Sequence, residues 1–226
     1  MGISKENAID LLNGLKANQS LKTLIFDDIK IEALSQELLA EGIYLNPFIE
    51  TLQFQNCTVC KDFGAAIKKI ISKHAEKNNE AKWLNGLRGD VDESQGNSGL
   101  SCISIRNCNL TNAAASLIVN ALSFDQYIQS VDLSFNCIEE EPIREIVGLL
   151  KSSIHIVNFD LRGNPGYNVE CSKTLIFRLL KNISRIKKDP KVLMSLAIPI
   201  YQGERMDKQR NAQTSSAYSN YRKTSN

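Results

Sequence analysis

The residues of this chain whose types could support nucleophilic or metal chemistry are six cysteines and two histidines. Cys57 and Cys60 have the Cys-x-x-Cys spacing found in redox-active and metal-binding pairs. A zinc site needs four nitrogen or sulfur ligands, and we expect neither His74 nor His155 to share an edge of the fold with these cysteines. A single pair of this kind is a weak motif, so we expect Cys57 and Cys60 to be structural.

Short catalytic and ligand-binding motifs are absent from the sequence. It contains no phosphate-binding P-loop, no HExxH zinc motif, no G-x-G-x-x-G dinucleotide motif and no GxSxG nucleophile motif. We therefore predict that the protein is not an enzyme. We also expect no catalytic residue, no cofactor, no metal site and no small-molecule substrate.

An internal repeat organises most of the chain. The template L-x-x-L-x-L-x-x-N/C-x-L, typical of leucine-rich repeats, matches five stretches that begin at Leu21, Ile49, Leu100, Ile128 and Ile156. Successive starts are 28, 51, 28 and 28 residues apart, so the second step is one period plus an insert of 23 residues. Each stretch predicts a short strand that ends in a turn.

The ninth position of the template predicts a structural role for two of the cysteines. It is occupied, in chain order, by Ile29, Cys57, Cys108, Asn136 and Asn164, a set that we call the ninth-position ladder. In the turn after each strand, a small polar side chain can satisfy backbone groups of the neighbouring coil, and a thiol is a tolerable substitute for an amide. We expect the ladder thiols to pack rather than to react.

Helical patterns separate the strand motifs. Residues 111–122 have Thr111 as an N-cap, and residues 139–150 have Pro142 near the helix start with three acidic residues at the positive end of the helix dipole. One strand and one helix per repeat is typical of the ribonuclease-inhibitor type of leucine-rich repeat. The predicted fold is therefore an α/β right-handed solenoid, with a curved parallel sheet on the concave side and helices on the convex side.

The repeat also predicts the domain organisation. Residues 1–20 contain a helix that belongs either to a preceding repeat or to an N-terminal cap, and both alternatives stay open. Residues 21–186 form five repeat units. Residues 187–206 would form a C-terminal cap. Residues 207–226 would form a disordered or extended basic tail, either a docking peptide for an acidic surface or an inert segment.

The insert, residues 75–99, carries Trp83, which is the only tryptophan of the chain. Its first half is helical in composition and its second half is a polar loop. Insertions in solenoids lie at one edge and often carry recognition, so an exposed Trp83 would be a binding anchor. The alternative, which we favour, is that Trp83 folds back with Leu84 and Leu87 onto neighbouring helices.

The predicted concave face is polar, small and mildly acidic. Because side chains alternate along a strand, every second strand residue belongs to this face. The candidate partner-binding residues among them are Asp27, Gln53, Gln55, Arg106, Asp132, Asp160 and Arg162. The face has neither an aromatic stripe for bases nor a Lys/Arg track for phosphates, so we expect a protein or peptide ligand and no nucleic acid.

Charge and hydropathy give expectations about the compartment. Residues 1–186 carry 19 Lys/Arg and 22 Asp/Glu, whereas residues 187–226 carry 8 and 3, so the basic part is the tail. No signal peptide is visible, and the longest apolar run, residues 192–201, is half a membrane span. Glycosylation sequons at Asn56 and Asn109 flank ladder positions that we expect to be packed. We therefore expect a cytoplasmic protein with reduced cysteines and no membrane insertion.

Several stretches resemble the leucine-rich-repeat region in the family of the centrosomal protein of 78 kilodaltons. They are "LLNGLKANQSLKTL", "HAEKNNEAKWLNGLRGD" with its tryptophan, "RNCNLT" and "FDLRGNPGYN". The resemblance covers about residues 10–186 and leaves out the long C-terminal half with coiled coil that the family has. It implies a non-catalytic interaction module at a centriole, basal body or cilium, with cytoskeletal or ciliary protein partners.

Two functions follow as hypotheses. The first is a protein–protein interaction scaffold of the centriole, basal body or ciliary axoneme. The alternative is a leucine-rich-repeat regulator of an enzyme such as a small GTPase or ubiquitin ligase. In the case of a GTPase, Arg106 or Arg162 would stabilise the charge of a transferred phosphate. Their positions in the strand motifs favour instead a role as partners of Asp132 and Asp160.

Overall fold

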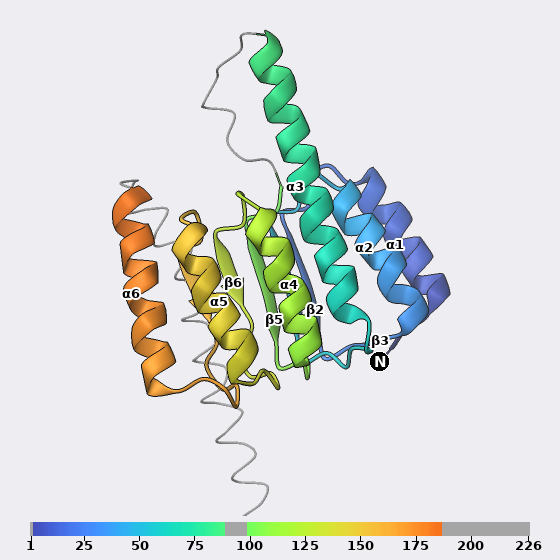
Figure 1. Ribbon diagram of the computed structural model, residues 1–226. Helices are drawn as coiled ribbons and strands as arrows, with labels where there is room; N and C mark the ends of the chain where they lie inside the picture. Colours follow the sequence, from blue (N-terminus) through green and yellow to red (C-terminus); the bar gives the residue numbers. More distant parts are fainter. Residues whose placement is uncertain (1, 89–98, 187–226) are drawn as a thin grey trace, which may run out of the picture. The chain divides into compact units, whose positions relative to one another are not determined.

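The computed structural model describes residues 2–88 and 99–186, in which strands and helices alternate along the chain (Figure 1). The strands are β1 (Gly2–Ile3), β2 (Thr23–Asp27), β3 (Lys30–Ile31), β4 (Thr51–Gln55), β5 (Cys102–Arg106), β6 (Ser130–Asp132) and β7 (Asn158–Asp160). The helices are α1 (Lys5–Ala17), α2 (Ala33–Leu45), α3 (Phe63–Arg88), α4 (Asn112–Phe124), α5 (Glu140–Ser152) and α6 (Val169–Ile186).

Five strands form one parallel sheet in the order β2-β4-β5-β6-β7, which is the order of the chain. The first residues of these strands pair in register, and they are Thr23, Thr51, Cys102, Ser130 and Asn158. The spacing of these paired residues along the chain is the spacing of the template matches, including the longer second step. The predicted α/β fold with a parallel sheet is confirmed, and the insert does not shift the register between β4 and β5.

The helices lie side by side against one face of the sheet (Figure 1). Polar side chains cap the starts of α1, α4 and α6: Ser4 accepts a hydrogen bond from the Asn7 N–H, Thr111 from the Ala114 N–H and Asn168 from the Cys171 N–H. Pro142 is the third residue of α5, where the missing backbone N–H leaves no helical bond unmade. The short pair of β1 with β3 was not predicted.

The core lies between the sheet and the helices. The alternate strand residues that point toward the helices are almost fully buried, and they include Leu52, Phe54, Ile103, Ile105 and Val131. The Phe26 and Phe54 rings stack with their centroids 4.9 Å apart, and the edge of Phe63 contacts Phe54. Each unit therefore buries its apolar side chains partly against the next one.

Helix α3 differs from the arrangement expected for the insert. Helices α1, α2, α4 and α5 each have 13 residues, whereas α3 has 26. The first half of the predicted insert is therefore not a separate element but the continuation of the repeat helix. We call residues 76–88 the α3 projection, because α3 extends beyond its neighbours there (Figure 1).

Some predicted segments lie outside the described residues. They are the second half of the insert (89–98), the C-terminal cap (187–206) and the basic tail (207–226). Within the described part of the chain, no helix is both long and apolar enough to cross a bilayer.

Candidate protein-binding surfaces

The four polar members of the ninth-position ladder occupy equivalent places in the structure. The Cys57 thiol donates to the Phe26 carbonyl oxygen at 3.4 Å, and the Cys108 thiol donates to the Phe54 carbonyl oxygen at 3.5 Å. Phe26 and Phe54 both occupy the sixth position of the preceding unit. Each thiol thus links its turn to the strand before it.

Asn136 and Asn164 make the same link with amides. The Asn136 amide donates to the Ile105 carbonyl oxygen at 2.6 Å, and the Asn164 amide donates to the Leu133 carbonyl oxygen at 2.9 Å. Asn136 also accepts hydrogen bonds from the N–H groups of Cys108 and Leu110 through Oδ1. An asparagine therefore satisfies buried donors and acceptors together, whereas a thiol reaches only the acceptors.

Ile29, the first member of the ladder, is connected differently. Its side chain is half-buried against the core, and it is the backbone carbonyl that accepts a hydrogen bond, from Thr58 N–H at 3.0 Å. Ile31 N–H in turn donates to the Thr58 carbonyl oxygen. At this end of the ladder, backbone pairing takes the place of the polar side chain.

The ladder thiols are electrostatically linked to each other. A hydrogen bond from Cys108 lowers the pKa of Cys57 to about 7, although burial opposes this shift. The same hydrogen bond and burial raise the pKa of Cys108. Cys60 lies apart from this pair and donates to Gln36 Oε1 at 2.7 Å. Among residues 2–88 and 99–186, no three His, Cys, Asp or Glu side chains are grouped so that they could hold a metal ion.

On and just after β6 and β7, the candidate residues of the helix-free sheet face make internal polar contacts. The Arg162 guanidinium forms a bidentate ion pair with Asp160, whose side chain is buried, through Nε to Oδ1 at 3.0 Å and Nη2 to Oδ2 at 2.6 Å. Asp132 accepts hydrogen bonds from the Ser134 N–H and the Ser104 hydroxyl. Burial raises the pKa of Asp132, and the hydrogen bonds from Ser134 oppose this shift.

Arg106 shares Ser134 as a hydrogen-bond partner with Asp132. Its guanidinium donates to the Ser134 hydroxyl at 2.9 Å and lies over the Phe135 ring, 4.4 Å from the ring centroid. It therefore contacts a hydroxyl and a ring, whereas Arg162 pairs with a carboxylate. Phe135 has a positive φ of 58° and is 43% exposed, so this left-handed residue presents its ring to Arg106 at the end of β6.

Of the candidate residues on β2 and β4, Asp27 is exposed, and Gln53 and Gln55 are half-buried. Gln55 donates to Gln53 through their side chains, and Asp27 accepts a hydrogen bond from Asn56. Ile25 is exposed on the same face. Among the predicted binding residues, Asp27 is exposed, Asp160 is buried and the other five are half-buried. The directly bonded pairs are Gln53 with Gln55 and Asp160 with Arg162.

Trp83 does not fold back onto neighbouring helices, so the favoured prediction was wrong. Its side chain is 64% exposed, and Leu84 and Leu87 are also exposed at 39% and 66%. The packed helices α2 and α4 end at Leu45 and Phe124, and the α3 projection extends past their level (Figure 1). The side chains at positions 83, 84 and 87 of a helix lie on one side of it.

A polar cluster holds the base of the α3 projection. The Tyr127 hydroxyl donates to Asn79 Oδ1 at 2.7 Å, and burial raises the pKa of Tyr127, so the hydroxyl stays a donor. The Asn78 amide lies 2.9 Å from His74 Nε2, and His74 Nδ1 lies 3.8 Å from Asp125 Oδ2. These contacts tie one turn of α3 to the segment before β6.

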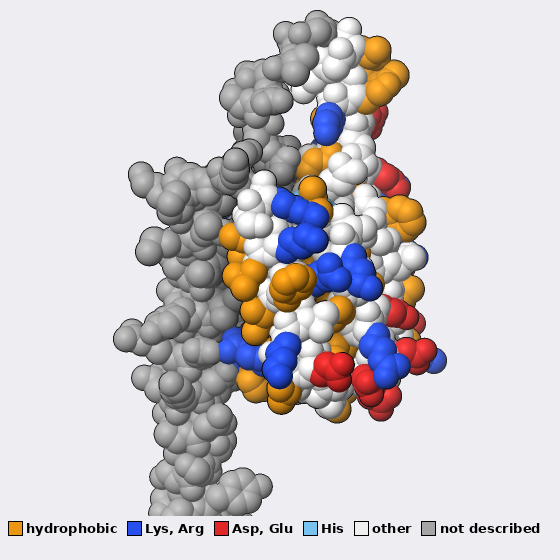
Figure 2. Space-filling view, turned by 60° about the vertical axis from the view of Figure 1, so that its left-hand side comes forward, with side chains coloured by type: hydrophobic (Ala, Val, Ile, Leu, Met, Phe, Trp, Pro, Cys, Tyr) orange, Lys and Arg blue, Asp and Glu red, His pale blue; other side chains and the backbone are white. Residues whose placement is uncertain are grey.

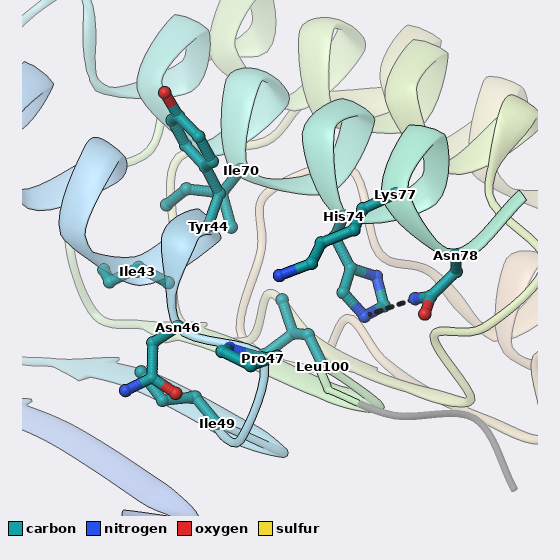
Figure 3. A pocket seen from close by; sticks show the side chains of 10 residues that line it. All are labelled: Ile43, Tyr44, Asn46, Pro47, Ile49, Ile70, His74, Lys77, Asn78 and Leu100. Carbon is teal, nitrogen blue, oxygen red and sulfur yellow. Dashed lines mark hydrogen bonds between the residues drawn. The ribbon is translucent and has the colours of Figure 1, made fainter. Parts of the chain in front are cut away.

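A small pocket adjoins this cluster and is shown in Figure 3. Its volume of about 20 Å³ suffices for about one water molecule. His74, Lys77 and Asn78 of α3 face residues of the α2–β4 connection, among them Asn46 and Pro47. We regard this pocket as part of the structural base of α3 and not as a ligand site.

A second series of polar side chains was missed in the sequence. The side chains of Asn18, Asn46 and Asp125 each accept hydrogen bonds from backbone N–H groups just before a strand. Each of these residues stands three positions before the start of a template match, and this constant offset could have been found. In contrast, the Asn182 amide donates to the carbonyl oxygens of Ser153 and Ile156 and holds α6 to the preceding unit.

The geometry defines an α/β protein with a five-stranded parallel sheet, one layer of helices and one projecting helix. A solved structure, "Leiomodin-1 Actin-Binding Site 2 (ABS2)", has a similar fold, with a TM-score of 0.58 at 11% identity. The match covers 90% of this chain and 96% of that one. At this identity the likeness shows the fold alone.

The sequence is similar to that of one particular protein, the "Centrosomal protein of 78 kDa". The mouse protein is 24% identical over 182 residues, or 80% of this chain, and the human protein is 24% identical over 174 residues, or 76% of it. The chain spans about a quarter of the length of these relatives, 23% and 25% respectively. No known protein-family profile matches the chain. The two matches support the resemblance found in the sequence.

Proposed function

We propose that the chain is a non-catalytic protein–protein interaction scaffold of the centrosome, acting at the centriole, basal body or ciliary axoneme. Its partners would be cytoskeletal or ciliary proteins. The similarity to two centrosomal proteins supports the location. The observation that carries the mode of action is the α3 projection, with Trp83 64% exposed.

We propose also that the five strand–helix units are leucine-rich repeats of the ribonuclease-inhibitor type in a right-handed solenoid. The strand register repeats from unit to unit, and each of the four polar ladder residues bonds a carbonyl oxygen of the unit before it. Both observations support this assignment. Such stacks are stable through contacts between neighbours, so one unit can carry an additional segment.

The α3 projection has the features of a helix that docks into a groove. Trp83, Leu84 and Leu87 place large apolar side chains on one side of a helix that, among the described residues, has no neighbouring helix there. Partners recognise such helices through anchors one turn apart, and tryptophan is enriched among energetic anchors. The charged residues of the projection's first two turns, Glu76, Lys77, Glu80 and Lys82, balance one another, so apolar contacts would provide most of the affinity.

The guanidinium groups of the sheet face support scaffolding over regulation of a GTPase. Arg162 is paired with Asp160, and Arg106 is held between Ser134 and Phe135. An arginine that stabilises a transferred phosphate must be able to reach the phosphate. Both side chains instead contribute to the internal contacts of the sheet face.

The test is the localisation of the full chain in cells. We would compare the tagged wild type with the triple variant Trp83→Ala, Leu84→Ala, Leu87→Ala, with Ile9→Ala on α1 as the control for loss of an exposed apolar side chain. We expect wild type and Ile9→Ala at the centrosome and the triple variant diffuse in the cytosol. The melting temperature of the triple variant should stay within about 2 °C of wild type, because exposed residues contribute little to stability.

Two outcomes would contradict the proposal. A wild-type signal that never concentrates at centrosomes or basal bodies would remove the location. A triple variant that is folded, reaches the centrosome and retains the wild-type set of proximity-labelled neighbours would remove the α3 projection as the docking element.

A further inference from the structure

Helix α6 has an outer side that carries large apolar residues, and no other described helix covers it. Each helix from α2 to α5 packs against a helix on both sides, whereas α6 packs only against α5 among the described helices. Val169, Ile176, Phe177 and Leu180 are 72%, 52%, 61% and 59% exposed. These four residues together with Lys173 make up what we call the α6 outer strip.

The other side of α6 is fixed to the preceding strand–helix units. We call the packed units of residues 21–186, without the α3 projection, the stack. Leu175 is buried, and the Asn182 amide donates to the carbonyl oxygens of Ser153 and Ile156 at 3.1 and 2.9 Å. The helix therefore presents the outer strip in a fixed orientation. A fixed apolar surface costs less entropy on binding than a segment that must first fold.

Lys173 lies in the middle of the strip. In a helix it is one turn from Val169 on one side, and one turn from Ile176 and Phe177 on the other. Lys181 and Arg185, both exposed, add positive charge along the same helix, and Glu170 is the single acidic residue of α6. Figure 2 shows hydrophobic and basic side chains intermixed on the face that α6 carries, with acidic ones toward its margin.

The position of Lys173 distinguishes between two kinds of binding surface. A helix that lies on a membrane keeps its cations beside the apolar face, where they can reach lipid headgroups. A lysine in the centre of the strip would enter the acyl boundary without a counter-charge, and desolvating it there is unfavourable. A protein partner can place a carboxylate opposite the lysine and cover the surrounding apolar side chains.

We propose that the α6 outer strip binds an amphipathic helix of a partner protein that carries a carboxylate among apolar residues. The carboxylate pairs with Lys173, and the apolar residues cover Ile176, Phe177 and Leu180. This surface is independent of the α3 projection and goes beyond the function proposed above. It gives the scaffold a second docking site that selects acidic helices.

The test uses the full chain and two synthetic amphipathic peptides, each long enough for about five helical turns. The peptides share one apolar pattern and differ in a central Glu or Lys. We expect wild type to bind the Glu peptide at least about tenfold more tightly than the Lys peptide, because opposite charges pair and like charges repel across an interface. Lys173→Glu should reverse this preference, whereas Lys69→Glu on α3, with the same change in charge, should keep it.

Other outcomes would overturn the proposal. These are failure of wild type to bind the Glu peptide at about 1 mM, or an unchanged preference in Lys173→Glu. Binding to vesicles containing phosphatidylserine that is lost in Lys173→Glu would assign the strip to membranes. A dimer of the full chain that is lost in Phe177→Ala would assign it to self-association. If Lys173→Glu fails to fold, Lys173→Gln must abolish the discrimination between the peptides.

Discussion

The two halves of helix α3 differ in what surrounds them. Residues 63–75 lie in the stack, where Phe63, Ile67 and Ile71 are buried and α4 packs closely. Residues 76–88 extend beyond the packed helices, and their large apolar side chains face solvent. One continuous helix thus joins a segment that stabilises the fold to a segment whose side chains are available to a partner. Replacing a glycine by alanine is therefore expected to change stability in opposite directions in the two halves, at Gly64 in the first and at Gly86 in the second.

The exposure of the second half of α3 follows from the length of the helix. Four helices of the stack have 13 residues, and α3 has twice as many. At about 1.5 Å per residue, the additional half of α3 places its end about 20 Å farther. No other helix among the described residues supplies contacts there, so the large apolar residues of the projection stay exposed.

The largest expected effect comes from the ladder of the stack, through Asn136→Ala. The substitution leaves two buried N–H groups, of Cys108 and Leu110, and the Ile105 carbonyl oxygen without their side-chain partner. We expect the free energy of unfolding to fall by about 3–5 kcal/mol, because each unsatisfied buried group costs about 1–3 kcal/mol. Urea denaturation monitored by circular dichroism measures this. A loss below about 1 kcal/mol would mean that water replaces the amide.

The second effect tests the packed half of α3 through Gly64→Ala. A Cβ at this position would lie 2.5 Å from Ala114 Cα and 2.6 Å from Ala114 Cβ, so α3 and α4 must separate. Overpacking of this kind costs about 1–3 kcal/mol, and the better helix propensity of alanine offsets part of it. We expect a lower urea midpoint with an unchanged slope. A variant as stable as wild type would show that the two helices can move apart freely.

The matched substitution in the projecting half is Gly86→Ala, with the opposite expected sign. A Cβ there meets nothing within 4 Å. Alanine should stabilise the local helix by about 0.5–1 kcal/mol. Amide hydrogen exchange over residues 76–88 should slow by a factor of about 2–5, while the global unfolding midpoint changes little. Faster exchange in this variant would contradict a helical projection that ends at Arg88.

The smallest expected effect is a pH dependence of the stack from His155. Burial lowers the pKa of His155, and the nearby Asp125 carboxylate offsets this only in part. Below the ordinary histidine pKa the unfolded chain binds a proton that the folded chain binds more weakly, so stability falls as the pH falls through this window. The melting temperature should therefore drop as the pH is lowered from above to below the ordinary histidine pKa, and by less in His155→Asn. An equal drop in both proteins would assign the effect to other groups.

The stack could be predicted from the sequence, and the projection could not. The strands were found because Leu52, Ile103 and Val131 recur at fixed positions of a template, and each is buried against the helices for the same reason. Thr111 was recognisable as an N-cap because its contact with Ala114 is local. Such features depend on neighbours at a constant distance along the chain.

The exposure of Trp83, in contrast, is not determined by residues at a constant distance from it along the chain. Whether Trp83 folds back depends on whether α3 bends after Ala75, and the residues from 75 to 88 are mostly helix formers with no proline to stop the helix. Large apolar side chains such as those of Trp83, Leu84 and Leu87 are more often buried than exposed, so the pattern favoured packing over projection. The pairing of Arg162 with Asp160 was predicted from their positions, whereas Arg106 contacts Ser134 and Phe135 instead of the expected Asp132. Phe135 has a left-handed backbone, which the sequence pattern did not indicate.

The unchanged pairing of β4 with β5 has a practical consequence. Thr51 pairs with Cys102 across the insert just as Cys102 pairs with Ser130 across an ordinary connection, so the sheet tolerates extra chain at this place. The connection is therefore the natural place to graft an epitope, a fluorophore or a foreign recognition helix. An engineered chain could change its binding specificity there while its folding energetics stay those of the parent.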